Sequence, residues 1–195
     1  EASLVAMTVN GILTLPGLLL GGWISDAARK WRANGPLLVV TLAAVLSVPF
    51  FVLATNASAG HYYAFLGFMG AAFALMYFYY STVYATIADV TEPKLRGTAM
   101  SIYFMAMYVL GGAFGPYAVG AISDFFTRRA SSAAGVAADT ASLEPFRGVG
   151  LQTAMYIVPL LVVGLAAILF MASRSVSAEI EEMQAWMRES AEPEL

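Results

Sequence analysis

The sequence contains no cysteine and only one histidine, His61, among its 195 residues. The absence of cysteine excludes disulfide bonds and thiolate metal ligands, and a single histidine cannot build a histidine metal cluster. Charged residues make up only 12% of the chain, and the net charge of -3 predicts no nucleic-acid partner. No paired carboxylates, and no nucleophile with a base beside it, lie at mid-depth in the apolar stretches. We therefore expect neither an enzyme nor a bound cofactor.

Apolar residues are abundant instead. They account for 59% of the chain, and the mean hydropathy is +0.72. A soluble domain of this length could not bury so much apolar surface. A helix needs about 20 apolar residues to cross the hydrocarbon core of a bilayer. Five stretches meet this length: residues 2–25, 36–55, 62–88, 98–123 and 149–172. The sequence predicts an all-α, polytopic transmembrane helix bundle over residues 1–174, with a cytoplasmic tail over residues 175–195.

The loops between these stretches predict the orientation, because cytoplasmic loops carry more lysine and arginine. Seven basic residues fall on one side and three on the other. The seven are Arg29, Lys30, Arg32, Lys94, Arg96, Arg174 and Arg188, and the three are Arg128, Arg129 and Arg147. We expect the N-terminus outside, the C-terminus in the cytoplasm, and the chain in the plasma (inner) membrane. A start at Glu1 and an odd number of spans predict a missing N-terminal part.

Polar residues divide the five stretches into two kinds. Residues 36–55 and 149–172 are apolar almost all round, which favours a peripheral position facing lipid. The other three stretches carry polar or small residues at helical spacing, and buried polar groups in a membrane face protein or water. The first, third and fourth spans are therefore expected to line an interior.

The first and fourth spans resemble each other at an offset of 98 residues. Gly17 falls on Gly115, Gly22 on Gly120, and the triplet ending at Asp26 on the triplet ending at Asp124. In the predicted topology the two copies run in opposite directions through the membrane. Inverted repeats are typical of secondary transporters. The alternative is a chance match between two glycine-rich helix ends.

Several motifs resemble the major facilitator superfamily. The segment GGWISDAARK is similar to the second copy of its signature loop, G-x-x-x-D followed by basic residues, although Ala27 and Arg29 depart from that pattern. The segment ADVTEPKLRGTAMSIYFMAMYVLGGAFGPYAVGAISD resembles the end of the tenth helix through the eleventh, and its P-x-x-R-G, G-x-x-x-G-P and G-x-x-S-D elements are similar to those of spinster-like members.

This resemblance implies helices eight to twelve of a twelve-helix fold, in which two six-helix halves rock about a central cavity. It implies secondary active transport of a small organic or amphiphilic solute by alternating access. The expected partners are the lipid bilayer, a small-molecule substrate, the missing N-terminal half and protons as a possible coupling ion. No metal site is expected.

The gating candidates lie at the cytoplasmic ends of the first and third spans and along the fourth. They are Gly22, Asp26, Arg29, Lys30, Asp89, Arg96, Gly111, Gly115, Pro116, Gly120 and Asp124. The family implies that Asp26 faces a helix N-terminus of the other half, where a carboxylate is stabilised. Asp89 has Arg29, Lys30 and Arg96 as possible ion-pair partners. The alternatives are a solvated loop acid at Asp26, interfacial snorkelling for the pair, and plain helix packing for the glycines.

The substrate-contact candidates are polar and aromatic side chains of the three interior spans. They are Asn10, Thr14, Tyr77, Tyr80, Ser81, Tyr84, Tyr103 and Tyr108. A tyrosine offers an apolar face and a hydroxyl, which suits an amphiphilic solute. The alternative is an aromatic packing stripe between helices. Residues 127–148 are rich in alanine, serine and glycine and are predicted to form a mobile loop. From Ser177 onward an amphipathic helix with a stripe of Ile180, Met183 and Met187 is predicted.

Three other functions compete with this prediction. A membrane-embedded enzyme lacks its catalytic groups. A non-transporting receptor or interaction module conflicts with the inverted repeat. An organic-anion or sugar-phosphate symporter would need cavity arginines in the missing half, because anions require them.

Overall fold

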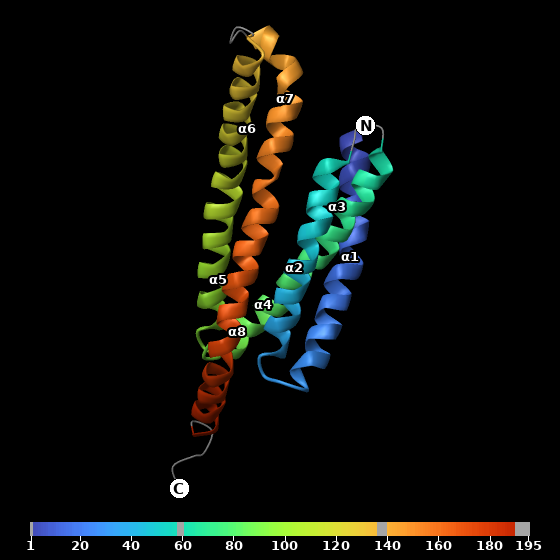
Figure 1. The fold of residues 1–195 in the computed structure, drawn as a ribbon. Helices are drawn as coiled ribbons and strands as arrows, with labels where there is room; N and C mark the ends of the chain where they lie inside the picture. The colour runs from blue at the N-terminus through green and yellow to red at the C-terminus, as the bar shows by residue number, and fades with distance from the viewer. Residues whose placement is uncertain (1, 58–60, 136–139, 190–195) are drawn as a thin grey trace. The chain divides into compact units, whose positions relative to one another are not determined.

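The computed structural model describes the backbone of residues 2–57, 61–135 and 140–189, and the side chains of residues 11–57, 61–135 and 143–189. Every regular element in these ranges is a helix (Figure 1). The helices are α1 (Ala2–Arg29), α2 (Gly35–Asn56), α3 (Tyr62–Met76), α4 (Phe78–Asp89), α5 (Arg96–Ala106), the π-helix η1 (Met107–Ala113), α6 (Phe114–Ala133), α7 (Thr140–Met155) and α8 (Ile157–Glu189). The prediction of an all-α transmembrane bundle is confirmed.

Five helical stretches are long and apolar enough to cross a membrane. They are Gly11–Arg29, Gly35–Asn56, Tyr62–Asp89, Arg96–Ala133 and Leu143–Glu189. The chain divides into two compact units. The first unit consists of residues 1–100 and 161–195, and the second unit of residues 101–160.

Prolines account for two of the three interruptions within these spans. Pro116 has no N–H to donate to the Gly112 carbonyl, and Gly112 lies within the wider π-helix η1. Pro159 likewise leaves the Met155 carbonyl without its donor, and α7 ends at Met155. The third interruption, at Tyr77 between α3 and α4, has no proline near it. There the Tyr80 amide donates to the Tyr77 carbonyl at 3.3 Å, one residue tighter than an α-turn.

The loop predicted over residues 127–148 is wrong for most of its length. α6 continues to Ala133, and α7 begins at Thr140. Alanine is the strongest helix former, and the Thr127 and Ser131 hydroxyls bond back to carbonyls three or four residues earlier rather than breaking the helix. The helix expected after Ser177 is present, but it continues α8 without a start of its own.

One apolar cluster of the first unit lies between α2 and α8. Leu37 and Val40 of α2 pack against Leu169 and Val176 of α8, and Ile180 extends this contact into the predicted tail stripe. The second span is the most enclosed of the five, with 39% of its most apolar window buried. Its peripheral position in the full bundle stays a prediction. Inside a membrane an apolar residue is compatible with lipid and with protein, so hydropathy does not distinguish the two.

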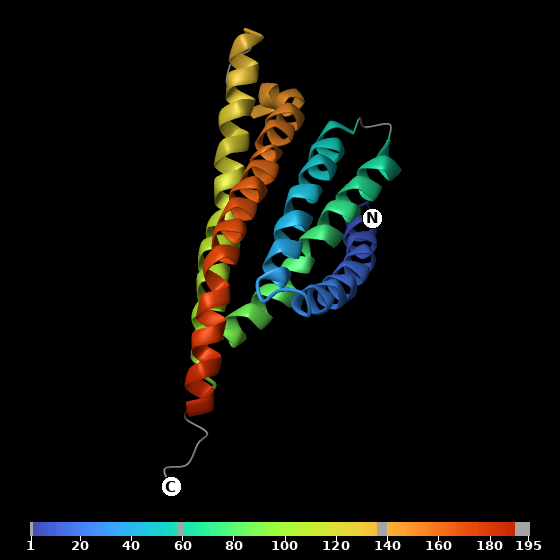
Figure 2. The same ribbon diagram turned by 60° about the horizontal axis from the view of Figure 1, so that its bottom comes forward.

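A seam with small residues on its α1 side joins α1 to α3 and α4, which lie side by side with α2 in Figure 2. Three residues of α1 at four-residue spacing face three residues at the same spacing, at a constant offset of 57. The pairs are Gly17 with Ala74, Gly21 with Phe78, and Ser25 with Thr82. A Cβ atom built at Gly17 or at Gly21 would lie only 2.7 Å from the Cα atom of its partner. We call these six residues the α1 seam. Residue numbers increase in the same direction on both sides of the seam, so α1 runs parallel to α3 and α4.

The second unit is built on an antiparallel pair, α6 and α7, which lie side by side in both views (Figures 1 and 2). Gly150 of α7 meets Thr127 and the Ser123 carbonyl of α6, and a Cβ at this position would lie 2.9 Å from the Thr127 amide nitrogen. Small residues at such a crossing let two membrane helices approach closely.

We expect Gly17→Ala to destabilise the chain, because the added methyl group meets the Ala74 backbone. Such overpacking costs about 1–3 kcal/mol. Gly11→Ala is the matched control, since it lies in the same helix with no atom within 4 Å of its Cβ position. Thermal unfolding in detergent measures both variants. A melting temperature for Gly17→Ala at or above that of Gly11→Ala would contradict the seam.

The α6–α7 contact of the second unit can be tested in the same way, with a control variant in the same helix. Gly150→Ala should lower the melting temperature, because the Thr127 hydroxyl and the Ser123 carbonyl occupy the space that a methyl group needs. Gly148→Ala lies in the same helix with open space around it and should raise stability slightly through its helix propensity. Equal melting temperatures for these two variants would refute the α6–α7 contact.

Candidate functional site

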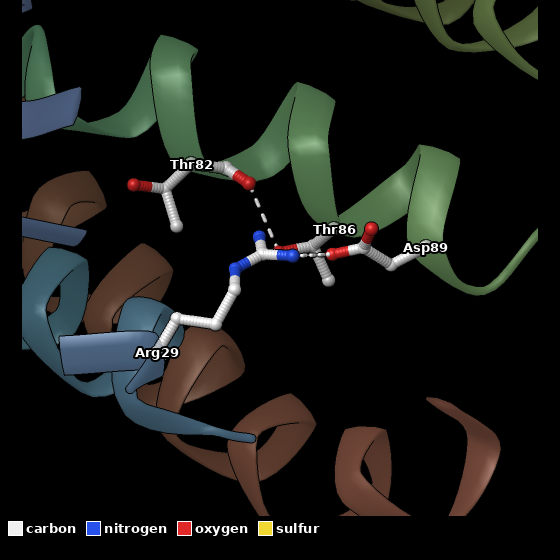
Figure 3. A network of polar contacts seen from close by, with 4 residues as sticks. All are labelled: Arg29, Thr82, Thr86 and Asp89. Atoms are coloured by element: carbon white, nitrogen blue, oxygen red, sulfur yellow. Dashed lines mark hydrogen bonds and ion pairs between the residues drawn. The ribbon is translucent and has the colours of Figure 1, made fainter. Parts of the chain in front are cut away.

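The lower end of the α1 seam is polar. The hydroxyls of Ser25 on α1 and Thr82 on α4 share a hydrogen bond of 2.6 Å, and the two residues are only 4% and 1% exposed. The Thr86 hydroxyl donates to the Thr82 carbonyl at 2.9 Å one turn further along α4 (Figure 3). In this bond one hydroxyl donates and the other accepts, so each buried group has a partner and the bond favours this register of the two helices.

An ion pair follows the hydroxyl pair at the end of both helices. A guanidinium nitrogen of Arg29, in the last turn of α1, contacts a carboxylate oxygen of Asp89, the last residue of α4 (Figure 3). The Arg29 side chain is 40% exposed and the Asp89 side chain 29%, so solvent screens their attraction. Such a pair contributes about 0–1 kcal/mol. Of the partners considered from the sequence, the structure pairs Arg29 with Asp89.

The other gating candidates of the first unit are placed differently. Asp26 and Lys30 are exposed at the end of α1, and no ion pair among the described residues includes either of them. The Arg96 Nε atom donates to the Thr91 carbonyl at 3.4 Å, so Arg96 stabilises the turn before α5. Gly22 lies beside the seam, and its Cβ position is 3.9 Å from the Ser81 Cβ atom.

The tyrosine stripe forms a ladder along α4. The ring centroids of Tyr77 and Tyr80 are 5.2 Å apart, and those of Tyr80 and Tyr84 are 5.8 Å apart. All three side chains are half-buried. The core cluster uses other residues of the same helix, among them Tyr79 and Val83. The ladder borders this packing, because the Tyr79 and Tyr80 ring centroids are 5.7 Å apart, and its half-buried side chains keep aromatic and hydroxyl groups at a partly open face.

Two further first-unit candidates, Thr14 and Ser81, use their hydroxyl groups within their own helices. Thr14 is 8% exposed, and its hydroxyl donates to the Gly11 carbonyl at 2.8 Å. The Ser81 hydroxyl donates to the Phe78 carbonyl at 3.2 Å. Both hydroxyl protons are used within their own helices, which leaves the oxygens able only to accept. The Asn10 side chain lies outside the described residues.

The candidates of the second unit lie on its long fourth span. Tyr103 is half-buried and Tyr108 is exposed, and Phe104 contacts both rings. Gly111 lies within η1, Pro116 follows it in α6, and Asp124 is exposed. Within this unit, a Cβ at Gly111, Gly115 or Gly120 would meet no atom within 4 Å. Gly17 and Gly115 are equivalent in the repeat but differ in structure, since only Gly17 is closely packed.

Sequence reasoning missed the hydroxyl pair. Thr82 was not among the candidates, and Ser25 entered only through the repeated triplet. The spacing of Gly17, Gly21 and Ser25 at every fourth residue was the available signal, since it puts three small residues on one helix face. Among the described residues, no group of three or more His, Asp or Glu side chains is arranged to hold a metal ion.

The comparisons with known proteins agree with this architecture. A family model described as Major Facilitator Superfamily matches residues 1–116, more than half of the chain. No curated protein matches the chain significantly. The matched region contains the α1 seam, the Arg29–Asp89 ion pair and the tyrosine ladder. The chain belongs to the Major Facilitator Superfamily, a family of multi-pass membrane transport proteins that are generally not enzymes.

Proposed function

We propose that this chain is the C-terminal part of a twelve-helix secondary transporter, with its five spans as helices eight to twelve. The transporter would move a small organic or amphiphilic solute by alternating access. Family membership supports membrane transport. The motifs shared with spinster-like members favour that branch. The basic residues favour an orientation with the Arg29–Asp89 end in the cytoplasm, and we place the protein in the plasma membrane.

The α1 seam carries this proposal. Alternating access requires helices that move as rigid bodies and contacts at their ends that differ between states. The close contacts at Gly17 and Gly21 and the buried Ser25–Thr82 bond couple α1 to α3 and α4. The exposed Arg29–Asp89 pair at the end of the same seam is weak enough to form and break. We propose that it stabilises the state that is closed at the cytoplasmic end.

The tyrosine ladder is the proposed solute contact. Its rings offer apolar faces for an alkyl or ring moiety, and its hydroxyls can orient a polar head. The spans of this chain carry no acidic residue at mid-depth, where proton-coupling groups usually lie. If protons drive transport, the titrating group belongs to the helices that precede this chain in the proposed twelve-helix protein.

Transport by the full-length protein in proteoliposomes tests the proposal. A proton gradient is imposed, and the panel contains lysolipids, sugars and organic anions. We expect gradient-dependent movement of an amphiphile that falls about tenfold in Tyr80→Ala, because the loss of an aromatic contact with the solute costs about 1.4 kcal/mol. Tyr63→Ala is the control, because Tyr63 is 87% exposed at the opposite end of the span. Preference for organic anions would favour the symporter alternative. No movement of any solute by a well-folded protein would indicate a receptor-like module.

Substitutions in the Arg29–Asp89 ion pair should also change the transport rate. Arg29→Ala and Asp89→Ala should each lower the transport rate by up to about fivefold, since loss of about 1 kcal/mol changes a two-state population by that factor. The reversed pair, R29D/D89R, should recover part of the loss. Lys30→Ala is the control, because Lys30 is the adjacent exposed cation without a role in the pair. If the reversed pair is no better than either single variant, the pair does not act as proposed.

A further inference from the structure

A groove runs along the first unit between α4 and α8, and it has two adjoining parts. The apolar part has a volume of about 340 Å³ and is lined by residues such as Tyr79 and Val83 of α4 and Leu165 and Leu169 of α8. The second part has a volume of about 330 Å³ and lies beyond the end of α4. Val90 and Glu179 line both parts, so the groove is continuous. Each part alone is within the size range of small-molecule sites.

The second part of the groove is strongly acidic. Its lining contains Glu92, Glu179 and Glu182 and no basic residue. These carboxylates form no ion pair with any described residue. Lys94, two residues from Glu92, is exposed and forms no ion pair with a described residue. Three arginines on neighbouring turns interact with other groups. Arg174 lies over the Phe170 ring at 4.7 Å, and the Arg188 Nε atom donates to the Gln184 carbonyl. Arg96 donates to the Thr91 carbonyl. Three like charges without an ion pair to a described residue favour a cationic ligand.

Trp186 indicates which kind of cation the acidic part would bind. Trp186 lines the acidic part together with Met183. The indole ring is the best aromatic partner for a cation, and aromatic rings beside carboxylates are suited to quaternary ammonium groups. A quaternary ammonium also has no N–H groups to satisfy, so it can bind beside an apolar wall without unpaired donors.

We propose that this groove binds a single-chain amphiphile with a quaternary ammonium head. The alkyl chain lies in the apolar part between α4 and α8, and the cationic head lies among Glu92, Glu179 and Glu182 against Trp186. A zwitterionic or anionic head would place a negative group beside the three carboxylates, so such amphiphiles bind more weakly. The inference does not rest on transport, since binding at this groove is separate from solute movement past the tyrosine ladder.

Equilibrium binding of tritiated dodecyltrimethylammonium to the full chain in maltoside micelles tests the proposal. The variant E179Q/E182Q should raise the Kd about tenfold, because two exposed ion pairs are lost. The matched control, E181Q/E189Q, removes the same charge from the same helix at positions outside the groove and should change the Kd about twofold or less. Trp186→Leu should raise the Kd about threefold. Trp23→Leu, at an exposed tryptophan outside the groove, should leave it unchanged.

Two further measurements locate the site and identify the head group. Dodecylphosphocholine and dodecyl sulfate, used at the same tracer concentration, should bind at least about tenfold more weakly. A diazirine placed on the chain of the cationic probe should label peptides from α4 and α8. Equal effects of the two double variants, equal binding of the sulfate, or labelling confined to other helices would each overturn the proposal.

Discussion

The close approach of α1 to α3 and α4 is the constraint on which the rest of the first unit depends. At Gly17 and Gly21 the partner backbone occupies the space that a side chain would need, so only glycine permits the contact. This approach brings the Ser25 and Thr82 hydroxyls within 2.6 Å of each other, and it aligns Arg29 with Asp89 one turn further along. The hydrogen bond between the two buried hydroxyls offsets part of the cost of burying them, because one hydroxyl donates and the other accepts.

The number and length of the spans could be predicted from the sequence, because the bilayer imposes its thickness on every apolar helix. The tyrosine ladder could also be predicted, since residues 77, 80 and 84 share one face of any helix. The Arg29–Asp89 contact was one of three pairings that the sequence allowed. Choosing between them required the register of α1 on α4, and that register depends on contacts between residues 57 positions apart.

Other features could not be predicted for identifiable physical reasons. Alanine and serine between residues 127 and 135 are compatible with a loop or a helix, and in the structure α6 continues to Ala133 beside α7. Hydropathy does not show how much of α2 is buried against protein, because lipid and protein are equally apolar neighbours. The repeat predicts equivalent roles for Gly17 and Gly115, yet equivalent positions differ in packing when their neighbours differ.

The parallel register of the α1 seam is the central claim, and a cysteine cross-link tests it most directly. The sequence contains no cysteine, so an introduced pair has no competing thiol within it. The Cβ position of Gly22 lies 3.9 Å from the Ser81 Cβ atom, which suits a disulfide bond. The G22C/S81C pair should therefore cross-link in native membranes under mild oxidation, and the G22C/V83C pair, whose second residue packs on the core cluster, should not. Failure of the first pair, or equal cross-linking of both, would contradict the register.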